Sequence, residues 1–271
     1  MSYLSRESSP VSPELWKQID TAVVNAARVV LAGRKFLHLF GPLGIGVSTI
    51  NVDDADGFEE VSKDGFITTK GRKIAELPII FEDFTLFARE LENSAQTGYP
   101  VDLSRAMSAA EACAIKEDKL IFWGNSDIGL DGLLTAEGSG KIAKTDWAKG
   151  ENAYADISSA IEILSEKSIY GAYALALSPD LFKQLQRIQP GTGLLEVDRI
   201  SKLLYGRIYQ TPVLGKNKAV LVCSDSRNMD LAIGQDIETA YLEQRELNHA
   251  FRVLETVLLR IKRKQAIVVF E

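Results

Sequence analysis

Histidine and cysteine are both scarce in this sequence of 271 residues, which contains two of each. The histidines, His38 and His249, are too few for most zinc and non-haem iron sites, which use at least two histidines in one place. The cysteines, Cys113 and Cys223, are too few for a secreted disulfide scaffold, and their apolar surroundings predict inert core residues. These scarcities predict a protein of the reducing cytosol without a bound metal or a disulfide.

An excess of basic charge and long apolar runs are also missing. The 31 Lys and Arg residues stand against 37 Asp and Glu residues, and the net charge of −6 disfavours nucleic acid as a partner. Apolar runs such as Ala219–Cys223 are too short to cross a bilayer, and Met1–Arg6 lacks the features of a secretory signal. The remaining composition, 46% hydrophobic and 25% charged, is that of a globular protein with one large domain or two small ones. We expect a cytoplasmic protein with no membrane partner.

Two long helices are indicated by apolar residues at three- and four-residue steps. The first begins at Ser12-Pro13-Glu14, which combines a capping residue, a first-turn proline and an acidic first turn. Its apolar stripe is wider than one helix face, and it ends near Gly33. The second follows Asp102-Leu103-Ser104 and covers residues 105–122. Roughly 18 helical residues span about 27 Å, which is long enough for the spine of a domain.

The later part of the chain alternates between segments with a helical pattern and segments with a strand pattern. Between residues 130 and 227 the pattern predicts a compact α/β unit. The expected helices are 153–167, 179–188 and 196–204, and the expected strands are 173–177, 207–211 and 219–223. Strands at 250–261 and 267–270 close the chain.

Residues 48–82 have a different character. Residues 47–52 and 66–69 look like two strands, and turn-forming segments lie between and after them. An extended hairpin fits this pattern, but it carries too few apolar residues to form its own core. We expect it to lie on another surface, such as a second subunit.

The motifs that carry chemistry are absent or incomplete. Gly41–Gly46 is glycine-rich but lacks the Lys-Ser/Thr pair of a phosphate loop, and Glu246-Leu247-Asn248-His249 is only half of a di-iron motif. Ser126 is not in a nucleophile elbow, and residues 260–264 are predicted to be a solvated basic turn. The acidic residues of the second helix, Glu111, Glu117 and Asp118, are predicted to form a solvated or salt-bridged face. We therefore expect no cofactor and no enzymatic activity, and a self-assembling subunit fits better.

A series of short motifs runs in order through nearly the whole chain. They are Ser9-Pro10, Trp16, Ile19-Asp20, Ala27-Arg28, Gly33-Arg34-Lys35-Phe36, Gly41-Pro42-Leu43-Gly44, Leu77-Pro78-Ile79, Asp83-Phe84, Pro100-Val101-Asp102-Leu103-Ser104, Glu117-Asp118-Lys119-Leu120-Ile121-Phe122-Trp123-Gly124, Gly132-Leu133-Leu134, Tyr173-Ala174-Leu175-Ala176-Leu177-Ser178-Pro179, Asn228-Met229-Asp230-Leu231-Ala232 and Phe251-Arg252-Val253 onward to Arg260-Ile261-Lys262. In these motifs the sequence resembles the encapsulin shell proteins.

The resemblance implies an α+β fold of the tailed-phage (Hong Kong 97-type) major capsid class, assembled as an icosahedral nanocompartment in the cytoplasm. It implies a cargo enzyme inside, such as a ferritin-like iron-storage protein or a peroxidase, held by a C-terminal cargo peptide. It divides the chain into an N-terminal arm and lumenal helix (1–47), an extended loop (48–82), a peripheral domain with the spine helix (83–129), an axial domain (130–227) and the closing strands of the peripheral domain (228–271). Some family members bind flavin beside an aromatic residue after the extended loop. Because the stretch Leu86-Phe87-Ala88-Arg89 has no Trp, we expect no flavin here.

Two interaction sites follow from the resemblance. The loop Gln189-Pro190-Gly191-Thr192-Gly193 is predicted to line a symmetry-axis pore, because glycines allow backbones to approach an axis closely. The cargo peptide is predicted to bind an apolar strip on the lumenal side of the first helix and the polar residues just beyond it. The residues predicted for this docking site are Val23, Ala27, Val30, Leu31, Arg34 and His38.

Two other functions are compatible with parts of the sequence. A prophage major capsid protein would share the fold, but the N-terminal helix and the lack of a scaffolding segment disfavour it. An uncharacterised cytosolic hydrolase is disfavoured because the sequence has only two histidines. Finding that the protein is a monomer would favour this alternative again.

Overall fold

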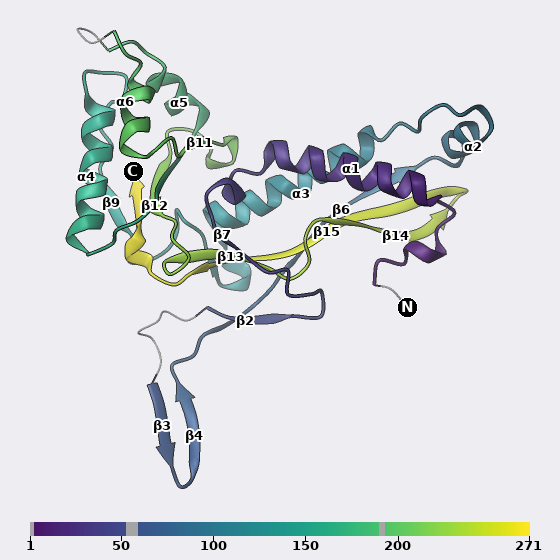
Figure 1. Ribbon diagram of the computed structural model, residues 1–271, viewed down its shortest axis with the longest axis horizontal. Coiled ribbons are helices and arrows are strands. Elements are labelled where there is room, and N and C mark those ends of the chain that lie inside the picture. Colours follow the sequence, from purple (N-terminus) through teal and green to yellow (C-terminus); the bar gives the residue numbers. More distant parts are fainter. Residues whose placement is uncertain (1–2, 53–58, 190–192) are drawn as a thin grey trace.

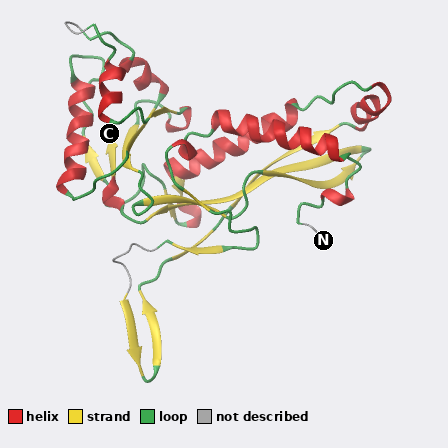
Figure 2. Ribbon diagram, in the orientation of Figure 1, coloured by secondary structure: helices red, strands yellow, loops and turns green. Residues whose placement is uncertain are grey.

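The computed structural model describes residues 3–52, 59–189 and 193–271, which form two bodies and a projecting arm (Figure 1). Each body combines a five-stranded sheet with helices packed on it, and most strand pairs are antiparallel (Figure 2). The architecture is therefore α+β, as predicted.

The first body is organised by one long strand, β15 (Asn248–Ile261). Its first half pairs with β14 (Glu238–Arg245) and β6 (Ile79–Leu86), and its second half pairs with β13 (Met229–Ile233), which also pairs with β1 (Leu39–Phe40). β15 thus pairs directly with three strands of this sheet, and β1 is joined to it through β13.

Two long helices pack along one face of this first sheet (Figure 1). Helix α1 (Pro13–Val30) starts as predicted, with the Ser12 hydroxyl accepting a hydrogen bond from the amide of Leu15 at 3.2 Å. Helix α3 (Ser104–Trp123) ends at Gly124, where φ is +69° and a Cβ would lie 2.2 Å from the carbonyl oxygen of Leu130. Only glycine fits this turn, which leads into the short β7–β8 pair (Gly124–Asn125 and Leu130–Asp131).

The core of the first body contains a cluster of aromatic rings. The Phe251 ring of β15 is fully buried and contacts Trp16 of α1, Phe84 of β6 and Tyr241 of β14, with ring centroids 5.2–5.6 Å apart. Aromatic pairs at such distances add to the stabilisation from burial. This cluster fixes α1 onto the sheet.

The second body has a sheet of five short strands in the order β11-β10-β12-β16-β9. Helices α4, α5 and α6 flank it, as Figure 2 shows. The bounds are β9 (Gly140–Ile142), α4 (Asn152–Glu166), β10 (Tyr173–Leu177), α5 (Pro179–Leu185), α6 (Glu196–Leu203), β11 (Ile208–Gln210), β12 (Ala219–Cys223) and β16 (Ile267–Phe270). The strands predicted here agree with the structure to within one residue at each end, because fully apolar runs identify buried strands.

The last strand differs from its predicted place. β16 pairs with β12 and β9 in the second sheet, although residues 228–271 were expected to complete the first body. The chain thus crosses between the bodies after β15, through the short turn at Lys264–Ala266. Strand order of this kind is set by long-range pairing and cannot be read from a local apolar run.

The arm is a hairpin, but its pairing differs from the prediction. Residues 66–69 were expected to pair with 47–52, whereas β4 (Phe66–Lys70) pairs with β3 (Glu59–Lys63). The strand at 47–52 is β2 (Thr49–Asn51), and it pairs with β5 (Ile74–Glu76) at the base of the arm. The arm therefore has two successive strand pairs, and the outer pair projects away from both bodies (Figure 1).

Several elements were not predicted from the sequence. They include the strands β3, β5, β6, β9, β13 and β14 and helix α2 (Ala88–Thr97), which lies at the far end of the first body. After α1 the chain forms a 3-10 turn at Gly33–Lys35, and the two-residue β1 follows at Leu39–Phe40. In β14 the half-buried pattern ends in four exposed residues, which hides its periodicity.

Candidate functional site

The predicted docking strip on α1 is largely inside the chain's own core. The side chains of Val23, Ala27 and Leu31 are buried, because α1 packs along α3 and also contacts β14. Val30 is half-buried, and the neighbouring Val29 is 79% exposed. The apolar surface accessible at this end of α1 is thus narrower than the sequence indicated, and it centres on Val29 and Val30.

Arg34 follows α1 and joins three elements of the first body. Its Nε and Nη2 atoms donate to both carboxylate oxygens of Glu117 on α3, at 2.7–2.9 Å. Nη2 also donates to Glu255 of β15 at 2.7 Å, and Nη1 donates to Asp236 at 2.6 Å. Of the six residues predicted to bind cargo, Arg34 is therefore committed to internal ion pairs, whereas the His38 side chain is exposed.

The acidic residues of α3 that were expected on a solvated or salt-bridged face have different surroundings. Glu117 and Asp118 have no solvent exposure, so the solvated alternative is wrong for both, and the salt-bridged one is right for Glu117. Asp118 instead accepts hydrogen bonds from the backbone amides of Ala32 and Gly33, at 2.9 Å each. Burial raises the pKa of Asp118 to about 6, and these two amides oppose the shift.

Two further predictions about single residues can be compared with the structure. Both cysteines are buried, so the prediction that they are core residues is confirmed, and burial raises the pKa of the Cys113 thiol to about 12. The ring nitrogen Nδ1 of His249, on β15, lies 3.2 Å from the hydroxyl of Tyr241 on the neighbouring β14, so this histidine is hydrogen-bonded inside the sheet. Among the described residues, no group of three or more His, Cys, Asp or Glu side chains is arranged to hold a metal ion.

The described residues of the predicted pore loop, Gln189 and Gly193, belong to the connection between α5 and α6 in the second body. Pro190, Gly191 and Thr192 are outside the described residues. Gln189 and Gly193 are described, and the base of the loop is closed by a bridge between Ile188 and Leu195. The amide of Gln189 donates to the carbonyl of Leu194 at 2.8 Å.

Arg187 braces this loop base against the body. Its guanidinium pairs with the buried Glu196 at 2.7 Å and donates to the carbonyl oxygens of Ala148 and Gly150. Gln189 Nε2 also donates to Gly150, at 3.3 Å. The two ends of the loop are therefore held in place by a set of contacts that the sequence pattern did not reveal.

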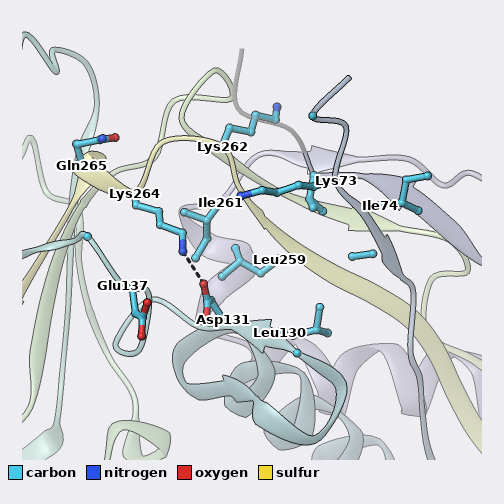
Figure 3. Close-up of a pocket in the computed structure, with 15 residues that line it drawn as sticks. Lys73, Ile74, Leu130, Asp131, Glu137, Leu259, Ile261, Lys262, Lys264 and Gln265 are labelled. Carbon is cyan, nitrogen blue, oxygen red and sulfur yellow. Dashed lines mark hydrogen bonds and ion pairs between the residues drawn. The ribbon is translucent and has the colours of Figure 1, made fainter. Parts of the chain in front are cut away.

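A cleft of about 620 Å³ separates the base of the arm from the two bodies (Figure 3). Its basic side chains include Lys264, which pairs with Asp131 at 2.8 Å, and Lys262, which pairs with Asp230 at 2.6 Å. Arg260 of the same segment is nearly buried and forms two 2.6 Å hydrogen bonds with Asp230. Three basic side chains of the segment 260–264 are thus held by ion pairs, so the segment is not a simple solvated turn.

The outer hairpin of the arm exposes two large apolar side chains next to each other. Phe66 and Ile67 are 73% and 68% exposed, and every residue of β4 is exposed. Two paired strands without a third strand or a core beneath them are marginally stable in water. The outer hairpin therefore has an exposed apolar surface that neither body covers.

Sequence reasoning missed the carboxyl group opposite Arg34. The alternation along β15, with Phe251, Val253 and Val257 facing the core, also places Glu255 on that inward face. A glutamate at an inward position of a buried strand is a signal of an internal ion pair, and it could have been recognised from the pattern.

Comparison with known proteins identifies what this arrangement resembles. A family model described as Linocin_M18, encapsulating protein for peroxidase, matches residues 1–258. The type 1 encapsulin shell protein EncA of Myxococcus xanthus is 38% identical, over 99% of this chain and 96% of that protein. A diheme-cytochrome-encapsulin shell fusion protein of Kuenenia stuttgartiensis is 37% identical, over 96% of this chain and 74% of its own length. A ferritin-like-encapsulin shell fusion protein of Pyrococcus furiosus is 27% identical, over 72% of this chain and 52% of its own length.

Solved structures show the same fold. A virus-like particle from Pyrococcus furiosus superposes with a TM-score of 0.78 at 24% identity, covering 95% of this chain and all of that one. The capsid of the myovirus XM1 superposes with a TM-score of 0.60 at 16% identity, covering 100% and 98% of the two chains. The fold is therefore that of the tailed-phage capsid proteins, as predicted. No helix among the described residues is long and apolar enough to cross a membrane.

Proposed function

The chain belongs to the encapsulin family of shell proteins, and from this we propose that it self-assembles into a closed icosahedral cage in the cytoplasm that encloses a cargo enzyme. The observation that carries this proposal is the outer hairpin of the arm. It has no core of its own and exposes Phe66 and Ile67, so it needs a neighbouring subunit to cover it.

The predicted division of the chain gives each part a role in this cage. The first body corresponds to the peripheral domain, the second to the axial domain, and the arm to the extended loop. In this proposal the arms link neighbouring subunits, and the tip of the second body meets its copies around a symmetry axis. The interface of each subunit would bury on the order of 2,000 Å² in total or more, as in obligate assemblies.

Replacing residues 59–70 with a short glycine-serine linker tests the role of the arm. The bodies keep their own cores, so the subunit should fold, and its circular dichroism should match that of the intact chain apart from the lost strands. Electron micrographs should show closed particles for the intact chain and none for the variant. Closed particles in the variant would refute the proposal, and a monomeric intact chain would favour a different function altogether.

The cargo is proposed to be a ferritin-like protein or a peroxidase, recruited through a short C-terminal peptide. Support comes from the family description, which names a peroxidase, and from the relative whose name joins a ferritin-like protein to an encapsulin shell protein. A tethered cargo inside a cage needs little affinity per site, because many identical sites share one enclosed volume. Particles should contain protein cargo and no nucleic acid. The ratio of their ultraviolet absorbance at the protein and nucleic-acid maxima measures the nucleic-acid content.

The docking proposal is best tested at the end of α1. Val30→Asp introduces a charge into the half-buried part of the predicted strip, and Val29→Asp is a matched variant at an exposed position that should not affect folding. Co-expression with a cargo that carries its C-terminal peptide should give closed but empty particles for both variants, because the accessible apolar surface at this end of α1 centres on both residues. Normal cargo loading in both variants would place the docking site elsewhere.

The loop at residues 189–193 is proposed to line a pore through which ions or small substrates reach the cargo. Replacing both Gly191 and Thr192 with bulky residues should slow substrate flux into loaded cages without preventing assembly. Unchanged flux would show that small molecules enter by another route.

A further inference from the structure

One guanidinium in the first body faces three carboxyl groups, and two of these are inaccessible to solvent. Glu117 and Glu255 have side-chain exposures of 0% and 1%, whereas Asp236 is 56% exposed. If all three carboxyl groups were ionised, the cluster would hold two more negative charges than positive ones. Uncompensated charge in a buried site is costly, so a cluster of this composition favours binding a proton.

The hydrogen bonds indicate which carboxyl group carries the negative charge. Both oxygens of Glu117 accept from Arg34, which is the bidentate arrangement of an ionised carboxylate. Glu255 accepts only one hydrogen bond from Arg34, through Oε2. Its other oxygen, Oε1, is buried and has no hydrogen-bond partner among the described residues. An orphaned oxygen is far less costly on a neutral acid than on a carboxylate.

The two carboxyl groups also lie next to each other. Oε2 of Glu117 and Oε2 of Glu255 are each 2.7 Å from the same nitrogen of Arg34, so they share one donor. We propose that Glu255 is a neutral acid at physiological pH, hydrogen-bonded to ionised Glu117, and that this shared proton latches the end of α1 to α3 and β15. Raising the pH removes the proton to solvent, leaves two adjacent buried carboxylates on one guanidinium, and releases the latch.

The surroundings of Glu255 support this assignment. The charged groups that face it are Arg34, Glu117 on α3 and Asp236 from the segment before β14, and only the first is positive. The thiol of Cys113, on the same side of α3, is uncharged. Burial and the nearby Glu117 raise the pKa of Glu255 well above its usual range, and Arg34 only partly opposes them. Asp118 is held separately by the amides of Ala32 and Gly33.

The direction of the pH effect follows from linkage. Because the folded protein holds this proton more tightly than the unfolded chain, its contribution to stability is complete at pH values below the unfolded pKa of a glutamate. This stabilisation is then lost as the pH rises towards the pKa of Glu255 in the folded protein. Over this range the equilibrium constant for unfolding increases about tenfold per pH unit. The contact that joins the end of α1 to α3 and β15 therefore weakens as the pH becomes alkaline.

Infrared spectroscopy of the assembled protein at pH 8, with 13C-labelled glutamate, tests the proton directly. The intact chain should show the carbonyl stretch of a protonated glutamic acid. Glu255→Gln should abolish this band, and so should Glu117→Gln, because Glu255 then becomes the only buried partner of Arg34 and ionises. Asp236→Asn, the matched control on the same guanidinium, should retain the band. Absence of the band from the intact chain, or its persistence in Glu255→Gln, would overturn the proposal.

Thermal unfolding between pH 6 and pH 10 tests the consequence. The melting temperature of the intact chain should fall with rising pH, and Glu255→Gln should flatten this fall and be the more stable protein at the alkaline end. If Glu255 is ionised instead, Glu255→Gln should be destabilised at every pH, which would refute the latch. Both measurements report on the fold of the subunit, so their outcome is independent of whether the cage encloses cargo.

Discussion

The exposed ring at the tip of the arm offers the sharpest test of how this subunit assembles. Phe66 is 73% exposed in the isolated chain, and its ring lies beside Lys63, its direct cross-strand partner. Complete burial of a phenylalanine side chain is worth about 1.5–3 kcal/mol, so covering the exposed part in a subunit interface would contribute about 1–2 kcal/mol. Phe66→Ala should therefore lower the association constant of each contact by about 5- to 30-fold.

The measurement is dissociation of purified particles in increasing guanidinium chloride, followed by light scattering at concentrations that leave the subunit folded. Phe66→Ala particles should dissociate at lower denaturant than the parent, and Phe66→Leu, which keeps an apolar side chain, should lie between them. The unfolding of dissociated subunits should be the same in all three proteins, since the ring makes no contribution to either core. Equal dissociation of Phe66→Ala and the parent would refute the argument that this ring lies in an interface.

Three further predictions concern the interior. Phe251→Ala, at the centre of the aromatic cluster, should lower the free energy of unfolding of the subunit by about 3–5 kcal/mol, measured by denaturant titration; a loss below about 1 kcal/mol would show that the cluster is not tightly packed. Asp118, with its pKa raised to about 6, should make the fold more stable as the pH falls from 7 to 4, and Asp118→Asn should remove this part of the slope in a series of melting temperatures; an unchanged slope would assign it to other groups. Arg187→Ala leaves Glu196 as an unpaired buried carboxylate and should destabilise the second body by about 3–5 kcal/mol while increasing hydrogen exchange at Ala148 and Gly150; unaltered exchange there would mean that Arg187 does not brace the loop.

Elements with a local signal could be predicted from the amino-acid sequence alone. The helix predicted at 105–122 is α3, and the strands at 173–177 and 219–223 match β10 and β12 to the residue, because periodicity and apolar runs reflect burial on one side or on both. The family resemblance and the α+β capsid fold were also available from the sequence, since many short motifs in order over the whole chain are specific even when each is not.

Features that depend on residues distant in the chain could not be predicted and are seen only in the folded protein. β16 joins the second sheet across more than forty residues from β12, and β4 pairs with β3 rather than with the strand at 47–52, because strand pairing is a long-range choice among edges of similar composition. The burial of Val23, Ala27 and Leu31 follows from the way α3 and β14 cover α1, which a helical stripe alone does not specify. Arg34 appears in the sequence as a basic residue after a helix; only the fold brings Glu117, Asp236 and Glu255 from three separate segments to one guanidinium, where burial makes their protonation a property of the structure.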